Sequence, residues 1–501
     1  MNLLDKVINY VSPEMGLARL KQRSLHGIIE ARGYDANDKG RRNGGWFRPK
    51  SNAESEVVAN YQGLADAGQE LCRNNPLAHH AKMIWAANIV GAGVRAELSS
   101  SSKRNRERVN YDFNKWANSV DCDFEGQYNF YGLQWLIAST IVESGGAFIR
   151  QHINNDVAGV PMQLQVLEQS MLDSSKTTGS GSEIRNGIQY NDVGQIEGYW
   201  LYSESDASVK TVRVSKFYKR GTEVIHIFRK ERAGQPLGVS WFTASANDLN
   251  NLSLLKEAKL TQAQILSCMA VIIEEATSPM GIGSEKDTSG MNVDSIEPAM
   301  IEYVKAGTKV HTVTPPSSND NGLFASSVKD DIAIGIGLSS TQLTGDYSKL
   351  NFASGRMSKI EFFQTLDYAQ LSMLQPALDQ IFNWYSKIYL LHSNIRSQLS
   401  VEWTFPPRGV VQPNEELDFN IKKTRVGIMS PSKLNKMYGT NLSDVVAQWK
   451  VDKVTWDGLP FDVNPELFSA AGNQLNDDDA ASSNNGVSNS TDDVDSGGDN
   501  E

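Results

Sequence analysis

Residues 345–357, GDYSKLNFASGRM, bring several side chains that could perform chemistry into thirteen positions. Ser348 stands beside Lys349, and Asp346 precedes the pair. A desolvated lysine amine can act as the base that activates a serine hydroxyl, so the loop could serve a hydrolase. However, adjacent side chains in a loop diverge, and the segment supplies no recognisable oxyanion hole. We therefore favour a structural interpretation of this segment over a catalytic one.

The same residues fit a shaped loop that precedes a helix. Gly345 and Gly355 permit backbone angles that other residues avoid, and Asn351 or Ser354 can cap the first turn of the helix. Apolar residues recur at helical spacing after residue 356. This interpretation explains the shape of the loop without any chemistry.

The remaining motifs predict no catalytic, metal or cofactor site. Gly91, Gly93 and Ala96 match a loose dinucleotide-binding pattern, but they follow a predicted helix where that motif requires a strand. No phosphate-binding GxxxxGK, HExxH or GxSxG motif occurs. The seven histidines lack the spacing of metal ligands, because His79 and His80 are adjacent and point apart on a helix. His226 alternates with apolar residues and is predicted to be structural.

Charge and cysteine usage narrow the class of protein further. The net charge is −11, and residues 476–501 carry eight acidic residues and no basic one, which leaves the rest of the chain near −3. Tight binding to nucleic acid requires a surplus of Lys and Arg, so the composition does not favour a protein that grips nucleic acid, although a nearly neutral surface could let DNA pass. The three cysteines form no CxxC pair, which favours a reducing compartment.

No membrane segment is expected. The longest uncharged run, residues 131–142, has about twelve residues, whereas a spanning helix needs ~20. The apolar run at the N-terminus contains Asp5 and Lys6, unlike a secretory signal.

The elements that must position the loop are helices and short strands, so the predicted fold class is α+β. Residues 145–228 form the β-rich part. A strand is also expected over 307–316, and residues 468–501 have the composition of a disordered acidic tail. The predicted helices cover 53–90 with a break near Pro76, 104–116, 246–277, 324–336, 356–391 with a kink at Pro376, and short pieces of 403–449.

The segment 246–277 is predicted to be one long helix of about 45 Å. Leu249, Leu252 and Leu255 form an apolar stripe along it, and Lys256 and Lys259 lie beside the stripe. This pattern indicates a helix that packs sideways against neighbours.

Several segments, in order along the chain, resemble the lambda family of tailed-bacteriophage portal proteins. The most recognisable is IAIGIGLSSTQLTGDYSKLNFASGRM, residues 332–357. The family's usual Asp-Pro is replaced here by Gln412-Pro413. The other similar segments are residues 73–97, 143–150, 187–202, 224–242 and 405–434.

The resemblance implies a portal fold with wing, stem, clip and small crown regions. Long stem and wing helices would accompany a β-rich wing module. The implied regions are an N-terminal wing (1–245), a first stem helix (246–277), a clip (278–322), a second stem helix (323–342), a tunnel loop (343–354), a long wing helix with C-terminal wing and crown (355–467), and an acidic tail (468–501).

It also implies a function without catalysis. Such proteins form a ring, typically of twelve copies, at one capsid vertex, where double-stranded DNA passes during packaging and ejection. The implied partners are further copies of the chain, the terminase large subunit, the major capsid or scaffold protein, and a head-completion or adaptor protein. Assembly would take place in the host cytoplasm and the product would reside in the virion.

The resemblance also implies two groups of site residues. One would line the channel and the other would pack the stem into the ring. Lys349 would touch phosphate while Asp346 keeps the surrounding potential near neutral. Two alternatives remain open, another head or neck ring protein and a Ser348/Lys349 hydrolase. The channel-lining residues would be Asp346, Tyr347, Ser348, Lys349, Leu350 and Asn351, and the packing residues Leu249, Leu252, Leu255, Lys256 and Lys259.

Overall fold

The computed structural model divides the chain into two compact units, Met1–Glu56 and Val57–Glu501. Nearly all described residues belong to the second unit. The structure describes residues 51–100, 102–157, 159–177, 183–202, 214–267, 272–274, 302–304, 321–348, 350–393, 398–409 and 412–456.

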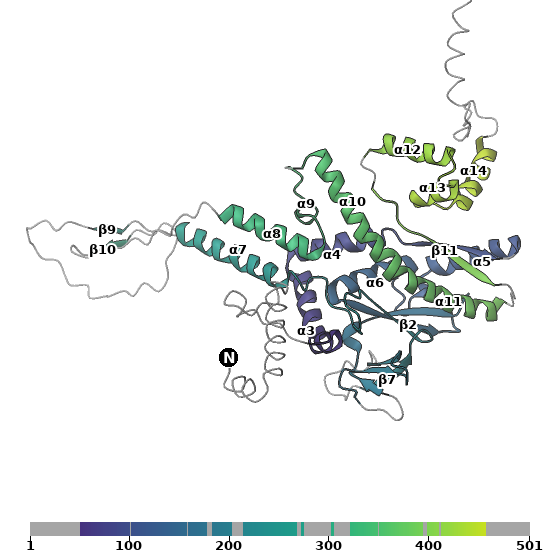
Figure 1. Cartoon of the computed structure of the whole chain (residues 1–501), viewed down its shortest axis with the longest axis horizontal. Helices are drawn as coiled ribbons and strands as arrows, with labels where there is room; N and C mark the ends of the chain where they lie inside the picture. Colours follow the sequence, from purple (N-terminus) through teal and green to yellow (C-terminus); the bar gives the residue numbers. More distant parts are fainter. Residues whose placement is uncertain are drawn as a thin grey trace, which may run out of the picture. The chain divides into compact units, whose positions relative to one another are not determined.

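Helices and strands are mixed along the chain, which confirms the predicted α+β class (Figure 1). The helices are α3 (Ala53–Asn74), α4 (Pro76–Ile89), α5 (Lys103–Asn118), α6 (Phe130–Ser144), α7 (Ala246–Ser267), α8 (Asn321–Ile336), α9 (Ser340–Thr344), α10 (Phe352–Tyr368), α11 (Gln375–Ser393), α12 (Pro413–Arg425), α13 (Pro431–Met437) and α14 (Leu442–Trp456). The strands are β1 (Arg95–Ser100), β2 (Gly146–Ile153), β3 (Met162–Glu168), β4 (Glu183–Arg185), β5 (Ile188–Tyr190), β6 (Ile196–Tyr202), β7 (Ser215–Lys219), β8 (Val224–Phe228), β9 (Ile272–Glu274), β10 (Glu302–Val304) and β11 (Leu399–Thr404). Within the described residues no helix is long and apolar enough to cross a membrane.

Helix α4 lies at the centre of the larger hydrophobic core. Its start is set by Asn75, whose side-chain oxygen accepts hydrogen bonds from the Leu77 and Ala78 amides at 2.9 and 3.4 Å. Pro76 occupies the first turn, where its missing N–H costs nothing. The predicted break near Pro76 is thus confirmed. Small residues let neighbours approach closely, and the fully buried side chains are Ala78, Ala81, Trp85, Ala86 and Ile89.

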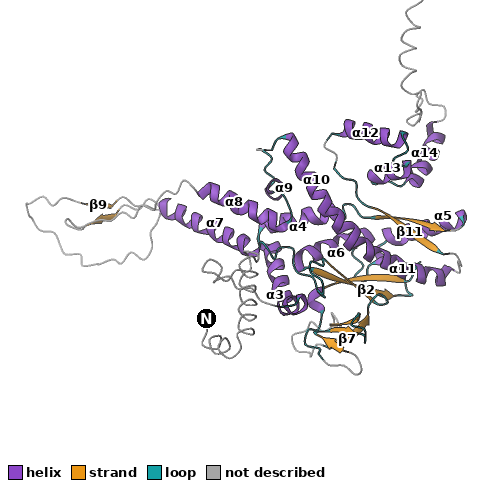
Figure 2. Cartoon of the chain, in the orientation of Figure 1, coloured by secondary structure: helices purple, strands orange, loops and turns teal. Residues whose placement is uncertain are grey.

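Two antiparallel sheets make up the predicted β-rich part (Figure 2). The first has the strand order β3-β2-β8, and the second has the order β4-β5-β6-β7. Helix α6 leads into β2 through Gly145, whose φ of +92° ends the helix in a left-handed turn. A Cβ on Gly145 would also meet the backbone of Val239 at 2.3 Å, so only glycine fits this turn.

Strands β1 and β11 form a separate antiparallel pair that the sequence did not predict. Arg95 pairs with Thr404, and Ser100 pairs with Leu399, about 300 residues apart in the chain. β1 follows the Gly91/Gly93 turn, so this glycine pattern joins a helix to a strand. The order of elements is the reverse of the one that a dinucleotide-binding loop needs, as predicted.

The predicted long helix over 246–277 is shorter in the structure. Helix α7 ends at Ser267, and residues 272–274 form β9, which pairs in parallel with β10. Ile272 and Ile273 are β-branched, which favours a strand over a helix once a partner strand is present. The strand expected over 307–316 lies outside the described residues.

The helix predicted over 324–336 is confirmed, and its end has a local cause. Helix α8 stops at Ile336, and Gly337 adopts a φ of +80°. The amide of Leu338 then donates to the Ala333 carbonyl at 2.9 Å, which is the Schellman way of closing a helix. Ser339 and Gln342 form a capping box that starts the separate short helix α9.

The long helix predicted over 356–391 is interrupted by a π-helical segment, Ala369–Leu374, between α10 and α11. Pro376, two residues after this segment, cannot supply an amide hydrogen to the preceding turn. The segment presents Gln370 to the end of α4, where its side-chain nitrogen donates to the carbonyls of Asn88 and Ile89 at 3.0 and 3.1 Å. These are carbonyls that the end of a helix leaves unpaired. The insertion therefore fastens the long helix to α4.

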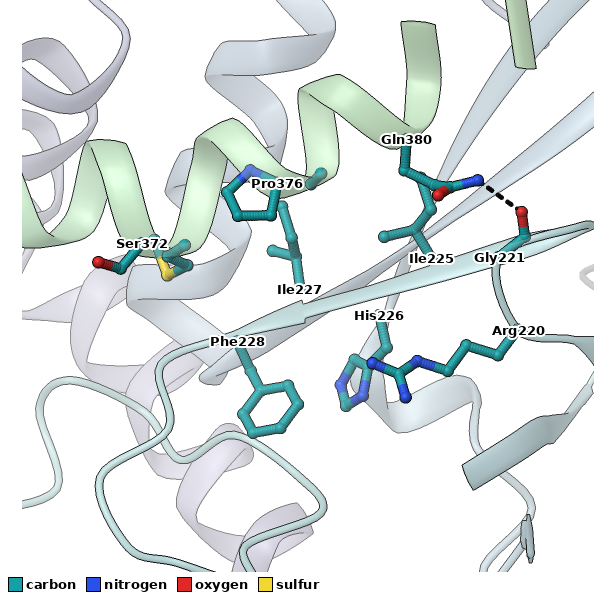
Figure 3. Close-up of a pocket in the computed structure, with 11 residues that line it drawn as sticks. Arg220, Gly221, Ile225, His226, Ile227, Phe228, Ser372, Pro376 and Gln380 are labelled. Carbon is teal, nitrogen blue, oxygen red and sulfur yellow. Dashed lines mark hydrogen bonds between the residues drawn. The ribbon is translucent and has the colours of Figure 1, made fainter. Parts of the chain in front are cut away.

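A pocket of about 270 Å³ lies where this segment faces β8 (Figure 3). Gln380 donates to the Gly221 carbonyl at 2.6 Å, and the Trp384 indole donates to the same oxygen at 2.8 Å. His226 lies against Phe148, with 4.3 Å between ring centroids, and its Nε2 is 3.2 Å from the Gln169 amide oxygen. Burial, with a smaller effect of the Arg220 charge, lowers the pKa of His226 to about 3. His226 is thus a neutral packing residue, as the sequence predicted.

Gly335 of α8 lies against Ser245, the residue before α7, and this contact is testable. A Cβ at Gly335 would lie 2.1 Å from Ser245 Oγ, which donates to the Ile332 carbonyl at 3.0 Å. We expect Gly335→Ala to lower the free energy of unfolding by about 1–3 kcal/mol, measured by chemical denaturation. Gly322→Ala is the matched control, because nothing lies within 4 Å of its Cβ position. Equal effects of the two substitutions would show that the close approach is absent.

His226 should make stability depend on pH. Because its folded pKa of about 3 lies below the usual 6.5, the unfolded chain binds the extra proton between these values. The contribution of His226 to the free energy of unfolding is fully present above pH 6.5 and is lost as pH falls towards 3. We expect wild type to lose about 1–2 kcal/mol more than His226→Gln between pH 7 and pH 5. His79→Gln, at an exposed position, is the matched control substitution. Parallel pH profiles for wild type and His226→Gln would contradict this.

Candidate functional site

The loop between α9 and α10 is held in a defined shape by its own polar groups. Gly345, with a φ of +71°, ends α9. Asp346 accepts hydrogen bonds from the Ser348 amide at 3.0 Å and from the Ser348 hydroxyl at 2.6 Å. Asn351 caps α10 by accepting from the Ser354 amide at 2.8 Å. The predicted cap at Asn351 is thereby confirmed.

The loop faces solvent over most of its length. Asp346, Tyr347, Ser348 and Asn351 are exposed, with Tyr347 at 60%, and Leu350 is partly covered. Lys349 lies outside the described residues. The Ser348 hydroxyl donates to a carboxylate in an exposed turn, whereas a serine nucleophile needs a site from which water is excluded. The geometry therefore suits a contact surface better than a catalytic dyad.

Behind the loop, α4 holds the end of α8 and the end of α9. The Trp85 indole donates to the carbonyl of Ile336 at 3.2 Å, at the end of α8. His80 Nδ1 is 3.0 Å from the carbonyl of Leu343, whose side chain is fully buried. A carbonyl only accepts, so His80 carries its proton on Nδ1 in this contact. The role of His80 was not foreseen, because its partner is 263 residues away in the chain.

The first residues of α10 complete the anchoring. Leu350 N donates to the Tyr347 carbonyl at 3.2 Å, and the Leu350 side chain lies over Gly355, where a Cβ would come within 2.7 Å. Further along α10, Phe362 packs against Trp85 with 5.1 Å between ring centroids. The exposed loop is thus fixed at both ends to buried residues.

The residues predicted to pack the stem divide into two sets. Leu249 and Leu252 are buried within the chain, while Leu255 and Lys259 are partly exposed and Lys256 is exposed. The α7 residues Leu249 and Ser253 also contact Asn75, whose side-chain nitrogen is 3.1 Å from Ser253 Oγ. Leu249 and Leu252 therefore pack the chain's own core.

Other apolar residues of α7 and α8 are exposed and were not predicted as site residues. Their exposure could have been predicted from the sequence. Side chains two positions apart on a helix, such as Leu252 and Leu254, face opposite sides, so the burial of one implies that the other faces away from the core. The exposed fractions are 54% for Leu254, 61% for Leu260, 75% for Leu323, 60% for Phe324 and 74% for Ile334.

Neither a metal site nor a disulfide emerges from the described part of the chain. It contains no group of three or more His, Cys, Asp or Glu residues that could hold a metal ion. Cys72 and Cys122 are buried free thiols, and burial raises the pKa of each to about 12. Such thiols are poor nucleophiles and poor metal ligands at neutral pH.

Comparison with known proteins agrees with the resemblance seen in the sequence. Residues 39–370 match the family model described as phage portal protein, lambda family. The chain is 23% identical over 433 residues to a probable portal protein of Halomonas phage phiHAP-1, covering 80% of this chain and 82% of the relative. It is 21% identical over 357 residues to portal protein B of Escherichia phage lambda, covering 63% and 66% of the two chains.

Solved structures similar to this chain come from the necks of gene transfer agent particles. The neck of an empty particle matches with a TM-score of 0.46 at 16% identity, covering 76% of this chain and 94% of that one. The neck of a native particle matches with a TM-score of 0.42 at 14% identity, covering 76% and 93%.

The curated relatives are named as portal proteins, which are structural components of phage particles and not enzymes. The hydrolase alternative is therefore set aside. Since the family model matches about two thirds of the sequence, this chain belongs to the lambda family of phage portal proteins.

Proposed function

We propose that copies of this chain close into a ring at one vertex of the capsid and form the conduit through which double-stranded DNA enters and leaves. In this proposal α7 and α8 form the stem, the loop 343–354 lines the channel, and α10 with α11 forms the long wing helix. The segments 1–245 and 355–467 supply wing and crown. The ring resides in the virion after assembly in the host cytoplasm.

The observation that carries the ring is the apolar surface of α7 and α8. The two helices run side by side and antiparallel, since Ser245 at the start of α7 bonds Ile332 near the end of α8 (Figure 1). Large side chains remain exposed on both, including Leu260 and Phe324. Single exposed leucines are ordinary, but large apolar side chains exposed along both helices of an antiparallel pair fit a surface that a partner covers. In a closed ring each copy gains two neighbours, which can cover both sides.

The exposed loop supports the channel assignment. A ring repeats each loop around its axis, so the few polar groups of one loop become a collar. Asp346 and Ser348 bond each other, which leaves the collar polar without a dense row of cations. DNA that must slide is best served by few phosphate contacts, because each one adds a barrier to movement.

The docking partners belong to the same proposal. In this proposal a separate motor, the terminase large subunit, supplies the energy for packaging. The motor docks on the clip, residues 278–322. Most of that segment lies outside the described residues. The wing and crown would face the capsid or scaffold protein, and a head-completion or adaptor protein would bind after packaging.

Ring formation should depend on the exposed leucines of α7. We expect Leu254→Asp combined with Leu260→Asp to abolish rings, because a buried carboxylate costs several kcal/mol at each interface. Native mass measurement and electron microscopy of the purified protein provide the readout. The control, Val193→Asp with Val214→Asp, changes exposed valines of the β-rich part and should leave rings intact. A wild-type chain that stays monomeric at every salt concentration, or a ring without an axial channel, would overturn the proposal.

The loop should act on DNA and not on assembly. Lys349→Ala is expected to leave rings intact while reducing the amount of DNA that is packaged or retained, measured as DNA content per particle. Lys230→Ala removes an equal charge from an exposed position outside the loop and serves as the control. If Lys349→Ala instead prevents ring assembly, the loop is structural and its assignment to the channel is wrong.

A further inference from the structure

A cleft of about 770 Å³ lies between α10 and the C-terminal helices α12 and α13. The segment that follows β11, including Phe405 and Arg408, forms part of its lining. Among the described residues that line it, five are basic and two, Asp367 and Glu416, are acidic. The basic residues are Arg356, Lys359, Arg408, Lys433 and Lys436.

Two of the five basic residues are already compensated. Arg408 forms an ion pair with Asp367, and its guanidinium lies 5.2 Å from the centroid of the Phe363 ring. Lys436 pairs with Glu97, at 3.9 Å, and with Glu402. These contacts belong to the fold and hold the cleft in shape.

The other three basic residues keep a positive surplus in the cleft. Arg356 contacts the neutral amide of Gln412 at 3.4 Å. Lys359 and Lys433 are exposed and make no ion pair within the described residues. With Glu416 as the remaining acid, the cleft holds about two uncompensated positive charges. It is therefore suited to an acidic group.

The size of the cleft limits what can enter. Its volume is that of sites that take a small molecule, roughly 300–1,000 Å³, which also accommodates a few residues of extended chain. A DNA duplex docks instead along a broad surface where it meets many phosphate contacts. The geometry therefore favours an acidic peptide over DNA.

The sequence supplies such a peptide from the same chain. No Lys or Arg follows Lys453, and Asp477, Asp478 and Asp479 form the first acidic cluster of residues 476–501. Helix α14 ends at Trp456 and packs on α13, which carries Lys433. About 20 residues connect α14 to this cluster, and a flexible linker of that length would span about 25 Å and give an effective concentration in the millimolar range.

We propose that residues 477–479 dock in this cleft of their own chain and pair with Arg356, Lys359 and Lys433. Docking would fasten α12, α13 and α14 to α10 and would cancel the positive surplus beside the loop 343–354. The cleft would then be closed to other polyanions. This inference stands on the cleft and the sequence, and it holds whether or not the chain forms a ring.

Zero-length carbodiimide cross-linking of the full-length chain tests the docking, with mass spectrometry of the peptides as the readout. We expect residues 477–479 to cross-link to Lys359 and Lys433 several-fold more than to Lys450 and Lys453. The latter two lie on α14, nearer along the chain, so a tail that is merely tethered would label them first. The cross-links to the cleft should fall several-fold at high salt.

Matched variants make the result specific. Asp477→Asn, Asp478→Asn and Asp479→Asn together should abolish the cross-links of the tail to Lys359 and Lys433. The same change at Asp492, Asp493 and Asp495 removes equal charge and should leave the cross-links between residues 477–479 and the cleft in place. Equal labelling of all four lysines would overturn the proposal. So would cross-links that join isotopically light and heavy chains in a mixed sample, because these would place the tail in a neighbouring copy.

Binding of a DNA duplex tests whether nucleic acid, instead of residues 477–479, occupies the cleft. Lys359→Gln with Lys433→Gln should leave binding of a short duplex to the full-length chain unchanged, because the tail occupies the cleft. The triple Asn variant at 477–479 should bind the duplex no more weakly than wild type. If the Lys→Gln pair abolishes duplex binding while the tail variant changes nothing, the cleft is a nucleic-acid site and the docking proposal is wrong.

Discussion

The indole of Trp85 connects the parts of this protein that the proposed function requires to act together. It is fully buried, donates to the last carbonyl of α8, and packs against Trp241 at 4.8 Å and Phe362 at 5.1 Å. Trp241 precedes α7, and Phe362 belongs to α10. One side chain thus joins the start of one proposed stem helix, the end of the other, and the long helix. Because buried aromatic contacts are short-ranged, none of these elements can shift without repacking the others.

The other contacts of α4 strengthen this constraint. At its beginning, Asn75 caps the helix and reaches Ser253 of α7. At its end, Gln370 from the π-helical segment caps the final carbonyls. Both ends of the helix, which would otherwise leave polar backbone groups unpaired, are satisfied by the elements that α4 must hold. The π-helical segment between α10 and α11 therefore contributes to holding α4 in the core.

The loop 343–354 gains its accessibility from this rigid support. Leu343 is buried and its carbonyl meets His80, while Tyr347 a few residues later is 60% exposed. A loop whose ends are fixed can present polar groups to a passing partner without losing conformational entropy at each encounter. That arrangement fits a family whose members are structural, and it explains why residues that look catalytic in the sequence need no catalytic function.

Features that depend on a few neighbouring residues could be predicted from the amino-acid sequence. Asn75-Pro76 set the start of α4, and Asn351 set the start of α10. The series of similar segments along the chain indicated the portal family. Contacts between residues far apart in the chain could not be predicted in this way. They include the β1–β11 pairing, the bond from His80 to Leu343, and the choice of which leucines of α7 are covered. The physical reason is that a cap or a turn is satisfied within one or two turns of chain, whereas burial depends on which surface arrives from elsewhere.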